Sequence, residues 1–180
     1  MATGVAILAG GAGSRIGGDK ALVELAGRPL IAYPLEAAAG AGLQAVVVAK
    51  RGTRLPALRV PVLLEPDLPL HPLLGVVTAL ASFATVIALP CDMPFVDGPA
   101  LTALAAMPAQ LATLLPGEPF PSLYRRAALP ALRAALRDGR SLRALHTRSA
   151  HARDAGDPLL TFSVNTRADL ALALARLRRR

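Results

Sequence analysis

The sequence predicts an α/β fold in which a mostly parallel sheet is covered by helices on both faces. Short apolar runs of strand length alternate with stretches of helical character along the 180 residues, which is the pattern of a parallel sheet with helical connections. Apolar residues make up 53% of the chain, which favours a packed core over disorder. Because the sequence shows no fixed repeat and no long linker, we expect residues 1–180 to form one domain.

The expected strands are apolar runs of four or five residues, each too short for a helix. The first of them is continuously apolar, which is typical of a strand that is buried on both faces. The expected strands are Val5–Ala9, Ala45–Ala49, Val60–Leu64, Thr85–Leu89, Ala112–Leu115 and a last short strand, Leu159–Ser163.

The expected helices carry signals at their ends. Pro29, Pro72 and Pro99 stand where a first helical turn tolerates proline. Gly40 and Gly42 follow the first helix, as glycine often does at a helix end. Pro34 lies inside that helix, which would therefore bend or begin later. The expected helices are Pro29–Ala39, Pro72–Ser82, Pro99–Ala106, Ala127–Arg137, Ser141–Leu145 and Arg167–Arg178.

A glycine-rich loop follows the first expected strand and predicts a phosphate-binding site. Glycine lets the backbone approach a ligand closely, successive N–H groups form a concave anion site, and cations add full charges. The spacing excludes a P-loop because Asp19-Lys20-Ala21 follows Gly18, and it excludes the dinucleotide fingerprint because Ile16 replaces the third glycine. The loop contains Gly10, Gly11, Gly13, Arg15, Gly17, Gly18 and Lys20.

A second informative stretch is Leu89-Pro90-Cys91-Asp92-Met93-Pro94, which comes directly after an expected strand. Ligands of open parallel sheets bind outside the carboxyl ends of the strands. A carboxylate at Asp92 is therefore well placed to hold Mg²⁺, which bridges phosphate oxygens. The alternative is an aspartate that only forms a turn between two prolines. We expect Cys91 beside it to be a packing residue with an inert thiol.

Residues 7–30 resemble the signature of the nucleotidyltransferases with a Rossmann-like fold, and most closely that of the molybdenum cofactor guanylyltransferases. The matching segments are Gly18-Asp19-Lys20-Ala21-Leu22 and Leu25-Ala26-Gly27-Arg28-Pro29-Leu30. Looser similarity extends from residue 4 to about residue 175. The resemblance implies a three-layer α/β/α sandwich of the nucleotide-diphospho-sugar transferase type. It also implies that the nucleotide is bound by Leu8, Ala9, Gly10, Gly11, Gly13, Lys20, Asp67, Gly75 and Asp92.

The later matches are less regular. Asp67 and Gly75 match the family's Asp and G-P-L-x-G, but His71 stands where the family usually has glycine. Leu123-Tyr124 and Gly139-Arg140-Ser141-Leu142-Arg143 resemble the family's P-L-Y and G-x-R-S-x-R. Near the C-terminus Asn165, Thr166 and Asp169 match N-x-N-T-x-x-D-L, while Ser163 replaces the first asparagine. The resemblance implies that the second substrate is bound by Asn165, Arg140 and Tyr124, with a helix-entry turn or a solvated helix face as the alternatives for Asn165 and Arg140.

The reaction implied by the resemblance is transfer of GMP from GTP to molybdopterin cofactor, with Lys20, Arg15 and Asp92 as catalytic residues and Mg²⁺ on Asp92. Ser163 and His71 leave open a cytidylyl- or sugar-nucleotidyltransferase of the same fold. A non-catalytic binding module for a phosphorylated cofactor is a further alternative. The resemblance also allows transient contact with other proteins of cofactor biosynthesis.

The composition limits the classes of binding partner that the sequence favours. The net charge of +8 suggests nucleic acid, but aromatic residues make up only 3% and no recognition motif is visible, so small anionic substrates are favoured. The uncharged run between Asp67 and Asp92 contains Pro69, Pro72 and Pro90, so we expect a buried helix and strand there and no membrane span. The single cysteine and the absence of a signal-peptide pattern favour a cytoplasmic protein.

Overall fold

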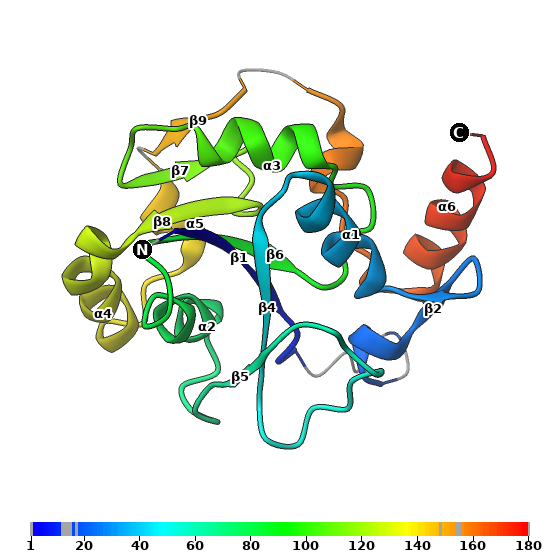
Figure 1. The fold of residues 1–180 in the computed structure, drawn as a ribbon, viewed down its shortest axis with the longest axis horizontal. Helices are drawn as coiled ribbons and strands as arrows, with labels where there is room; N and C mark the ends of the chain where they lie inside the picture. The colour runs from blue at the N-terminus through cyan, green and yellow to red at the C-terminus, as the bar shows by residue number, and fades with distance from the viewer. Residues whose placement is uncertain (1, 12–15, 17, 148, 154–155, 180) are drawn as a thin grey trace.

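A computed structural model of the protein describes residues 2–11, 16, 18–147, 149–153 and 156–179. A seven-stranded sheet forms its centre, and two further short strands pair beside it (Figure 1). The strands are β1 (Thr3–Leu8), β2 (Glu24–Leu25), β3 (Arg28–Pro29), β4 (Gln44–Ala49), β5 (Val62–Leu64), β6 (Thr85–Pro90), β7 (Leu111–Thr113), β8 (Ser122–Arg125) and β9 (Ala150–His151). The helices are α1 (Ala32–Gly40), α2 (Pro72–Ala79), α3 (Gly98–Ala105), α4 (Leu129–Arg137), α5 (Leu142–His146) and α6 (Arg167–Leu177). Short 3₁₀ turns occur at Lys20–Leu22, Arg126–Ala128 and Pro158–Thr161.

The strands of the central sheet follow the order β5-β4-β1-β6-β8-β7-β9. β1 pairs in parallel with β4 and β6, and β4 pairs in parallel with β5. β8 runs antiparallel to both of its neighbours, β6 and β7. Parallel strands end at one common edge, so Leu8, Ala49, Leu64 and Pro90 mark the edge where a ligand is expected.

Helices cover both faces of the sheet, as the alternation of apolar runs predicted. On one face α1 and α3 pack against each other and bury residues such as Ala38 and Leu101 against the sheet. On the other face α2 and α4 pack together and bury Val76 and Leu132. Successive strand residues alternate between the two cores: Ile7 belongs to the first and Ala6 to the second. The α/β/α sandwich with a mostly parallel sheet is therefore confirmed.

A smaller core lies beside the sandwich and includes residues of β2 and α6, two elements that lie close together in Figure 1. Leu25 of β2, Phe95 and Val164 are buried there, and α6 contributes Ala173. This packing holds α6 against β2, and just before α6 the Val164 N–H donates to Asp92 O at the edge of the sheet.

Two expected elements differ from the structure. The first helix begins at Ala32, because Arg28 and Pro29 pair with β2 as β3. Pro34 then falls in the first turn, where its missing N–H has no helical partner to lose. The prediction of a strand at Leu159–Ser163 was wrong: residues Pro158–Thr161 form a 3₁₀ turn. The Asp157 side chain accepts from the Leu159 N–H and caps that turn.

The uncharged run after Asp67 contains α2 and β6, as predicted. Within the described ranges, none of the helices is long and apolar enough to cross a membrane. β8 and β9 were not expected from the sequence, and β8 gives the sheet its antiparallel pairings on the side beyond β6.

Candidate active site

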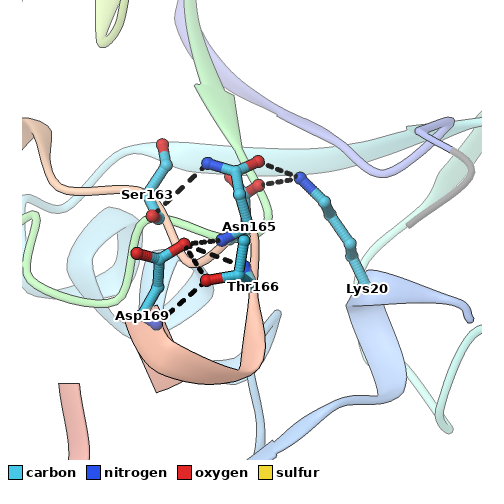
Figure 2. Close-up of polar contacts among 6 residues, drawn as sticks. Lys20, Ser163, Asn165, Thr166 and Asp169 are labelled. Carbon is cyan, nitrogen blue, oxygen red and sulfur yellow. Dashed lines mark hydrogen bonds and ion pairs between the residues drawn. The ribbon is translucent and has the colours of Figure 1, made fainter. Parts of the chain in front are cut away.

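Three side chains that are far apart in the sequence meet beside the end of β6. Lys20 lies in the 3₁₀ turn after the glycine-rich loop, Asp92 follows β6, and Asn165 stands just before α6. The Lys20 Nζ donates to Asp92 Oδ2 at 2.5 Å and to Asn165 Oδ1 at 2.6 Å. Figure 2 shows the Lys20 side chain reaching Asn165 from the other side of the site. The predicted proximity of Lys20 and Asp92 is therefore present in the fold.

Asp92 is buried but only half satisfied. Its side chain is 7% exposed, and its Oδ1 is buried without a hydrogen-bond partner among the described residues. The backbone around it is fixed, because the Cys91 N–H donates to Leu8 O and the Val164 N–H donates to Asp92 O. A rigidly held carboxylate oxygen without a partner costs free energy in the ligand-free fold and is ready to bind a cation.

A capping box at the start of α6 positions Asn165. The Thr166 hydroxyl accepts from the Asp169 N–H, and Asp169 Oδ2 accepts from the N–H groups of Asn165 and Thr166 (Figure 2). Burial acts to raise the pKa of Asp169, but the hydrogen bonds that it accepts outweigh burial and keep this pKa below its usual value. The capping box predicted from Thr166 and Asp169 is confirmed, and it holds the Asn165 backbone toward Lys20.

A cavity of about 500 Å³ opens at the ends of β1, β4, β5 and β6, and we call it the strand-end cavity. Its volume is within the range of small-molecule sites. Lys20 and Asp92 line it on one side, and residues at the ends of β4 and β5 line it on the other. Its lining includes Leu8, Gly10, Gly11, Lys50, Glu65, Leu70, His71, Cys91 and Phe120.

A second lysine–carboxylate pair lies in the strand-end cavity and was missed by the sequence analysis. Lys50 follows β4 and Glu65 follows β5, with Lys50 Nζ 3.5 Å from Glu65 Oε1. Burial raises the pKa of Glu65, and the Lys50 charge only partly opposes this. Lys50 Nζ also donates to the backbone carbonyls of Pro66 and Asp67, at 2.8 and 2.9 Å. The signal was available, because both residues directly follow apolar strands, as Asp92 does.

Two glycines of the site make room for Glu65. A Cβ at Gly10 would lie 2.5 Å from Glu65 Oε1. A Cβ at Gly75 would lie 2.8 Å from Leu8 Cδ2 and 3.0 Å from Glu65 Oε2. Gly75 is buried on α2 and does not line the cavity, so its missing side chain serves close packing behind Glu65.

Comparison with known proteins identifies the family. Residues 5–155 match the model of the MobA-like NTP transferase domain. The chain belongs to the MobA-like NTP transferase domain family. It is 38% identical over 105 residues to a molybdenum cofactor guanylyltransferase of Xanthomonas euvesicatoria pv. vesicatoria, covering 58% of this chain and 53% of that protein. It is also 38% identical over 100 residues to a protein of the same name from Cereibacter sphaeroides, covering 51% of each. The chain thus spans about half the length of these curated relatives.

Solved structures of MobA-like and related proteins have the same fold. Molybdopterin-guanine dinucleotide biosynthesis protein A from Archaeoglobus fulgidus superposes with a TM-score of 0.79 at 23% identity, covering 99% of this chain and 100% of the other. The 2-C-methyl-D-erythritol 4-phosphate cytidylyltransferase of Thermus thermophilus gives a TM-score of 0.70 at 21% identity, with coverage of 99% and 100%. The nucleotide-diphospho-sugar transferase type of sandwich is therefore confirmed for this MobA-like chain.

The remaining residues predicted to bind nucleotide lie at different depths. Ala9 is buried behind the lining, where its N–H donates to Val48 O. Asp67 is exposed and does not line the strand-end cavity, although its backbone carbonyl accepts from Lys50. Gly13 and Arg15 lie outside the described residues.

Cys91 is buried as expected. Burial, and to a smaller extent the nearby Asp92 charge, raises the pKa of its thiol to about 12.

The two residues predicted near the second substrate, besides Asn165, have opposite environments. Arg140 is exposed in the turn between α4 and α5. Tyr124 is fully buried on β8, and its hydroxyl hydrogen-bonds to Ser122 Oγ at 3.0 Å and to His146 Nε2 at 2.8 Å. The prediction that Tyr124 contacts a substrate was therefore wrong: its ring belongs to the core under α4, and its hydroxyl is already bonded within the protein.

Proposed function

We propose that this protein transfers GMP from GTP to the phosphate of molybdopterin cofactor, forming the guanine dinucleotide cofactor and pyrophosphate. The main support for this proposal is that the Lys20 side chain contacts both Asp92 and Asn165 at one wall of the strand-end cavity. The family and the names of the two curated relatives support the reaction type and both substrates. In this reaction an acceptor phosphate oxygen attacks the α-phosphorus of GTP, the bond to the β-phosphate breaks, and pyrophosphate leaves.

Lys20 is the residue that we assign to the triphosphate. In the ligand-free fold its ammonium is held by two side chains, Asp92 and Asn165, and it has room to turn toward a phosphate in the cavity. Charge-assisted hydrogen bonds from an ammonium stabilise the negative charge that develops on phosphate oxygens during transfer. No general base is needed, because the acceptor phosphate is ionised at neutral pH. The backbone N–H groups of Gly10 and Gly11, which line the cavity, are assigned to the same phosphates.

Asp92 fits a magnesium ion. Its buried Oδ1 lacks a partner among the described residues, and carboxylate oxygen is the ligand that Mg²⁺ prefers. The described residues contain no cluster of three acidic, histidine or cysteine side chains, so Asp92 would hold the ion together with phosphate oxygens of the nucleotide. When bound, Mg²⁺ would neutralise charge on the α-phosphate and orient it.

Glu65 supports guanine as the base. Its side chain is 10% exposed and lies in the strand-end cavity opposite Lys20 and Asp92. Guanine presents its N1–H and 2-amino group side by side, and a carboxylate accepts two such parallel hydrogen bonds. Cytosine lacks this pair of donors. We therefore assign base selection to Glu65, on the wall formed by β4 and β5.

The test is pyrophosphate release from GTP and molybdopterin cofactor, together with melting temperature in the presence of Mg²⁺ and each of the four nucleoside triphosphates. We expect release of pyrophosphate, and the largest rise in melting temperature with GTP, because a bound ligand stabilises in proportion to its occupancy. A larger rise with CTP or UTP would support a cytidylyl- or sugar-nucleotidyltransferase. GTP binding without pyrophosphate release would support a binding module.

A further inference from the structure

His71 uses both nitrogens of its ring to join two distant segments. Its Nδ1 lies 3.1 Å from the Leu73 nitrogen, and a backbone N–H can only donate, so Nδ1 is the acceptor and caps α2. The proton of the neutral ring is therefore on Nε2, which donates to the backbone carbonyl of Arg140 at 3.0 Å. This second hydrogen bond connects residues 69 positions apart, and we call it the His71 tether.

The segment that the tether reaches is a tight turn between α4 and α5. Gly139 adopts a φ of +62°, a left-handed conformation that ends α4. The Gly139 N–H donates to Leu136 O at 3.3 Å, and the Arg140 N–H donates to Ala135 O at 2.9 Å. These bonds fix the N–H groups of the turn toward α4, and the tether adds a fixed point for the Arg140 carbonyl.

The turn lies alongside two cavities. His71 lines the strand-end cavity, so the tether holds the Arg140 backbone against a residue of the cavity wall, although Arg140 itself is not part of the lining. A second cavity of about 420 Å³ is lined by Arg143, three residues beyond Arg140, and by Pro119. Phe120, the next residue after Pro119, lines the strand-end cavity, so the two cavities adjoin along the chain. Among the described residues the Arg140 guanidinium has no hydrogen-bond or ion-pair partner, and its charge is available to an anion.

We propose that His71 is a positioning residue that sets where Arg140 lies relative to a phosphate of the second substrate. The residue acts through the tether and does not touch the reacting atoms. The inference rests on the proposed function for the identity of that substrate. It also assigns a role to the residue that departs from the family's usual glycine: a glycine at position 71 could neither cap α2 with a side chain nor reach Arg140.

The test uses His71→Ser, which keeps the cap and removes the tether. A serine oxygen accepts from the N–H groups at a helix start, but it is too short to reach Arg140. The matched control is Asp97→Ser, because Asp97 caps α3 in the same way, at 2.8 Å from the Ala100 nitrogen, and lines neither cavity. A cooperative melting transition in each variant will show that both fold.

The first readout is amide hydrogen exchange at Gly139 and Arg140 in the ligand-free protein. We expect roughly fivefold faster exchange in His71→Ser and no change in Asp97→Ser, since one hydrogen bond contributes about that factor. Unchanged exchange in His71→Ser would overturn the tether, whatever the activity of the protein.

The second readout is steady-state kinetics with GTP and molybdopterin cofactor. We expect the KM for the cofactor to rise about fivefold in His71→Ser, while the KM for GTP and kcat stay within about twofold. The reason is that a misplaced Arg140 weakens binding of the acceptor equally in the ground state and in the transition state. A lower kcat with an unchanged cofactor KM would overturn the positioning role. If the parent protein releases no pyrophosphate, the proposed function fails and the exchange result alone decides on the tether.

Discussion

Two lysine–carboxylate pairs face the same cavity but are built differently. Lys20 contacts Asp92 at 2.5 Å and also donates a hydrogen bond to the side chain of Asn165. Lys50 lies 3.5 Å from Glu65 and donates to two backbone carbonyls of the loop that follows β5. Side-chain partners can be exchanged for a ligand without moving the backbone, whereas the carbonyl partners of Lys50 are fixed parts of the backbone that follows β5.

The remaining contacts of each pair, more than the residue types in it, indicate what the pair can do. Asp92 keeps one buried oxygen without a partner among the described residues, so the first pair is ready to accept a cation and release its lysine to a phosphate. Burial raises the pKa of Glu65 although Lys50 lies close, so the second pair carries a carboxylate that gains from donors supplied by a ligand. We therefore assign transfer to the first pair and base recognition to the second.

The largest expected effect is a difference in transfer rate when Asp92 and Glu65 are each replaced by the corresponding amide. Asp92→Asn should raise the barrier to transfer by about 2–4 kcal/mol, which slows transfer roughly 30- to 1,000-fold, because it removes the negative charge that would hold Mg²⁺. Glu65→Gln should leave kcat with GTP within about threefold. Pyrophosphate release under saturating substrates measures both. Equal losses in the two variants would erase the distinction between the pairs.

A second prediction concerns selectivity. Glu65→Gln should lower the preference for GTP over CTP by about tenfold to a hundredfold, because a hydrogen bond to a charged group contributes about 1.5–3 kcal/mol. Competition between the two triphosphates, followed by product analysis, gives this ratio. Asp92→Asn serves as the control, since its residual activity should keep the parent preference. An unchanged ratio in Glu65→Gln would remove base recognition from the second pair.

The two lysines should also differ. Lys20→Ala should raise the activation barrier for transfer by about 2–4 kcal/mol and lower kcat accordingly, because the ammonium stabilises the negative charge that develops on phosphate oxygens. Lys50→Ala should raise the KM for GTP and lower the free energy of unfolding by about 1–3 kcal/mol, because two carbonyls and Glu65 lose their partner. Kinetics and urea unfolding together test this. A loss of kcat in Lys50→Ala as large as in Lys20→Ala would contradict the assignment.

The wall behind Glu65 gives a smaller effect on stability. Gly75→Ala should lower the free energy of unfolding by about 1–2 kcal/mol, because its Cβ would press on Leu8 and Glu65. Gly52→Ala is the matched control, since a Cβ there meets nothing within 4 Å. Urea unfolding measures both variants. Equal stability of the two would show that the space beside Glu65 is not tightly packed.

The smallest effect is a difference in pH dependence between two carboxylates. The pKa of Glu65 is raised in the fold, so its contribution to stability is fully present below its unfolded pKa and is lost as pH rises through the folded value. The pKa of Asp169 is lowered, so its contribution is present above its unfolded pKa and is lost as pH falls. Glu65→Gln and Asp169→Asn should change the slope of unfolding free energy against pH in opposite directions. Slopes changed in the same direction would contradict this.

The sequence predicted the sandwich and the position of Asp92 because both follow from simple rules. Apolar runs as short as Val5–Ala9 must be buried strands, and parallel strands bring their carboxyl ends to one edge. Thr166 and Asp169 predicted the start of α6 because a capping box is local in sequence. The Lys50–Glu65 pair depends instead on the register of β4 with β5, in which Ala49 lies opposite Leu64.

The wrong predictions have local physical reasons. Tyr124 was assigned by a motif, but on a strand with helices over its face an aromatic ring can point into the core, and here it is fully buried. The apolar run at Leu159–Ser163 resembled a strand, yet Asp157 and Pro158 before it start a 3₁₀ turn. The link from His71 to Arg140 joins α2 to the α4–α5 turn, and no one-dimensional pattern indicates such a contact.

The most direct test of the account is the Mg²⁺ dependence of GTP affinity, measured by calorimetry on the parent protein and on Asp92→Asn. If Asp92 holds the ion beside the triphosphate, Mg²⁺ should tighten GTP binding by about tenfold or more in the parent protein and by less than about twofold in Asp92→Asn. An equal effect of Mg²⁺ on both proteins would contradict the assignment of the metal and the triphosphate to this wall of the cavity.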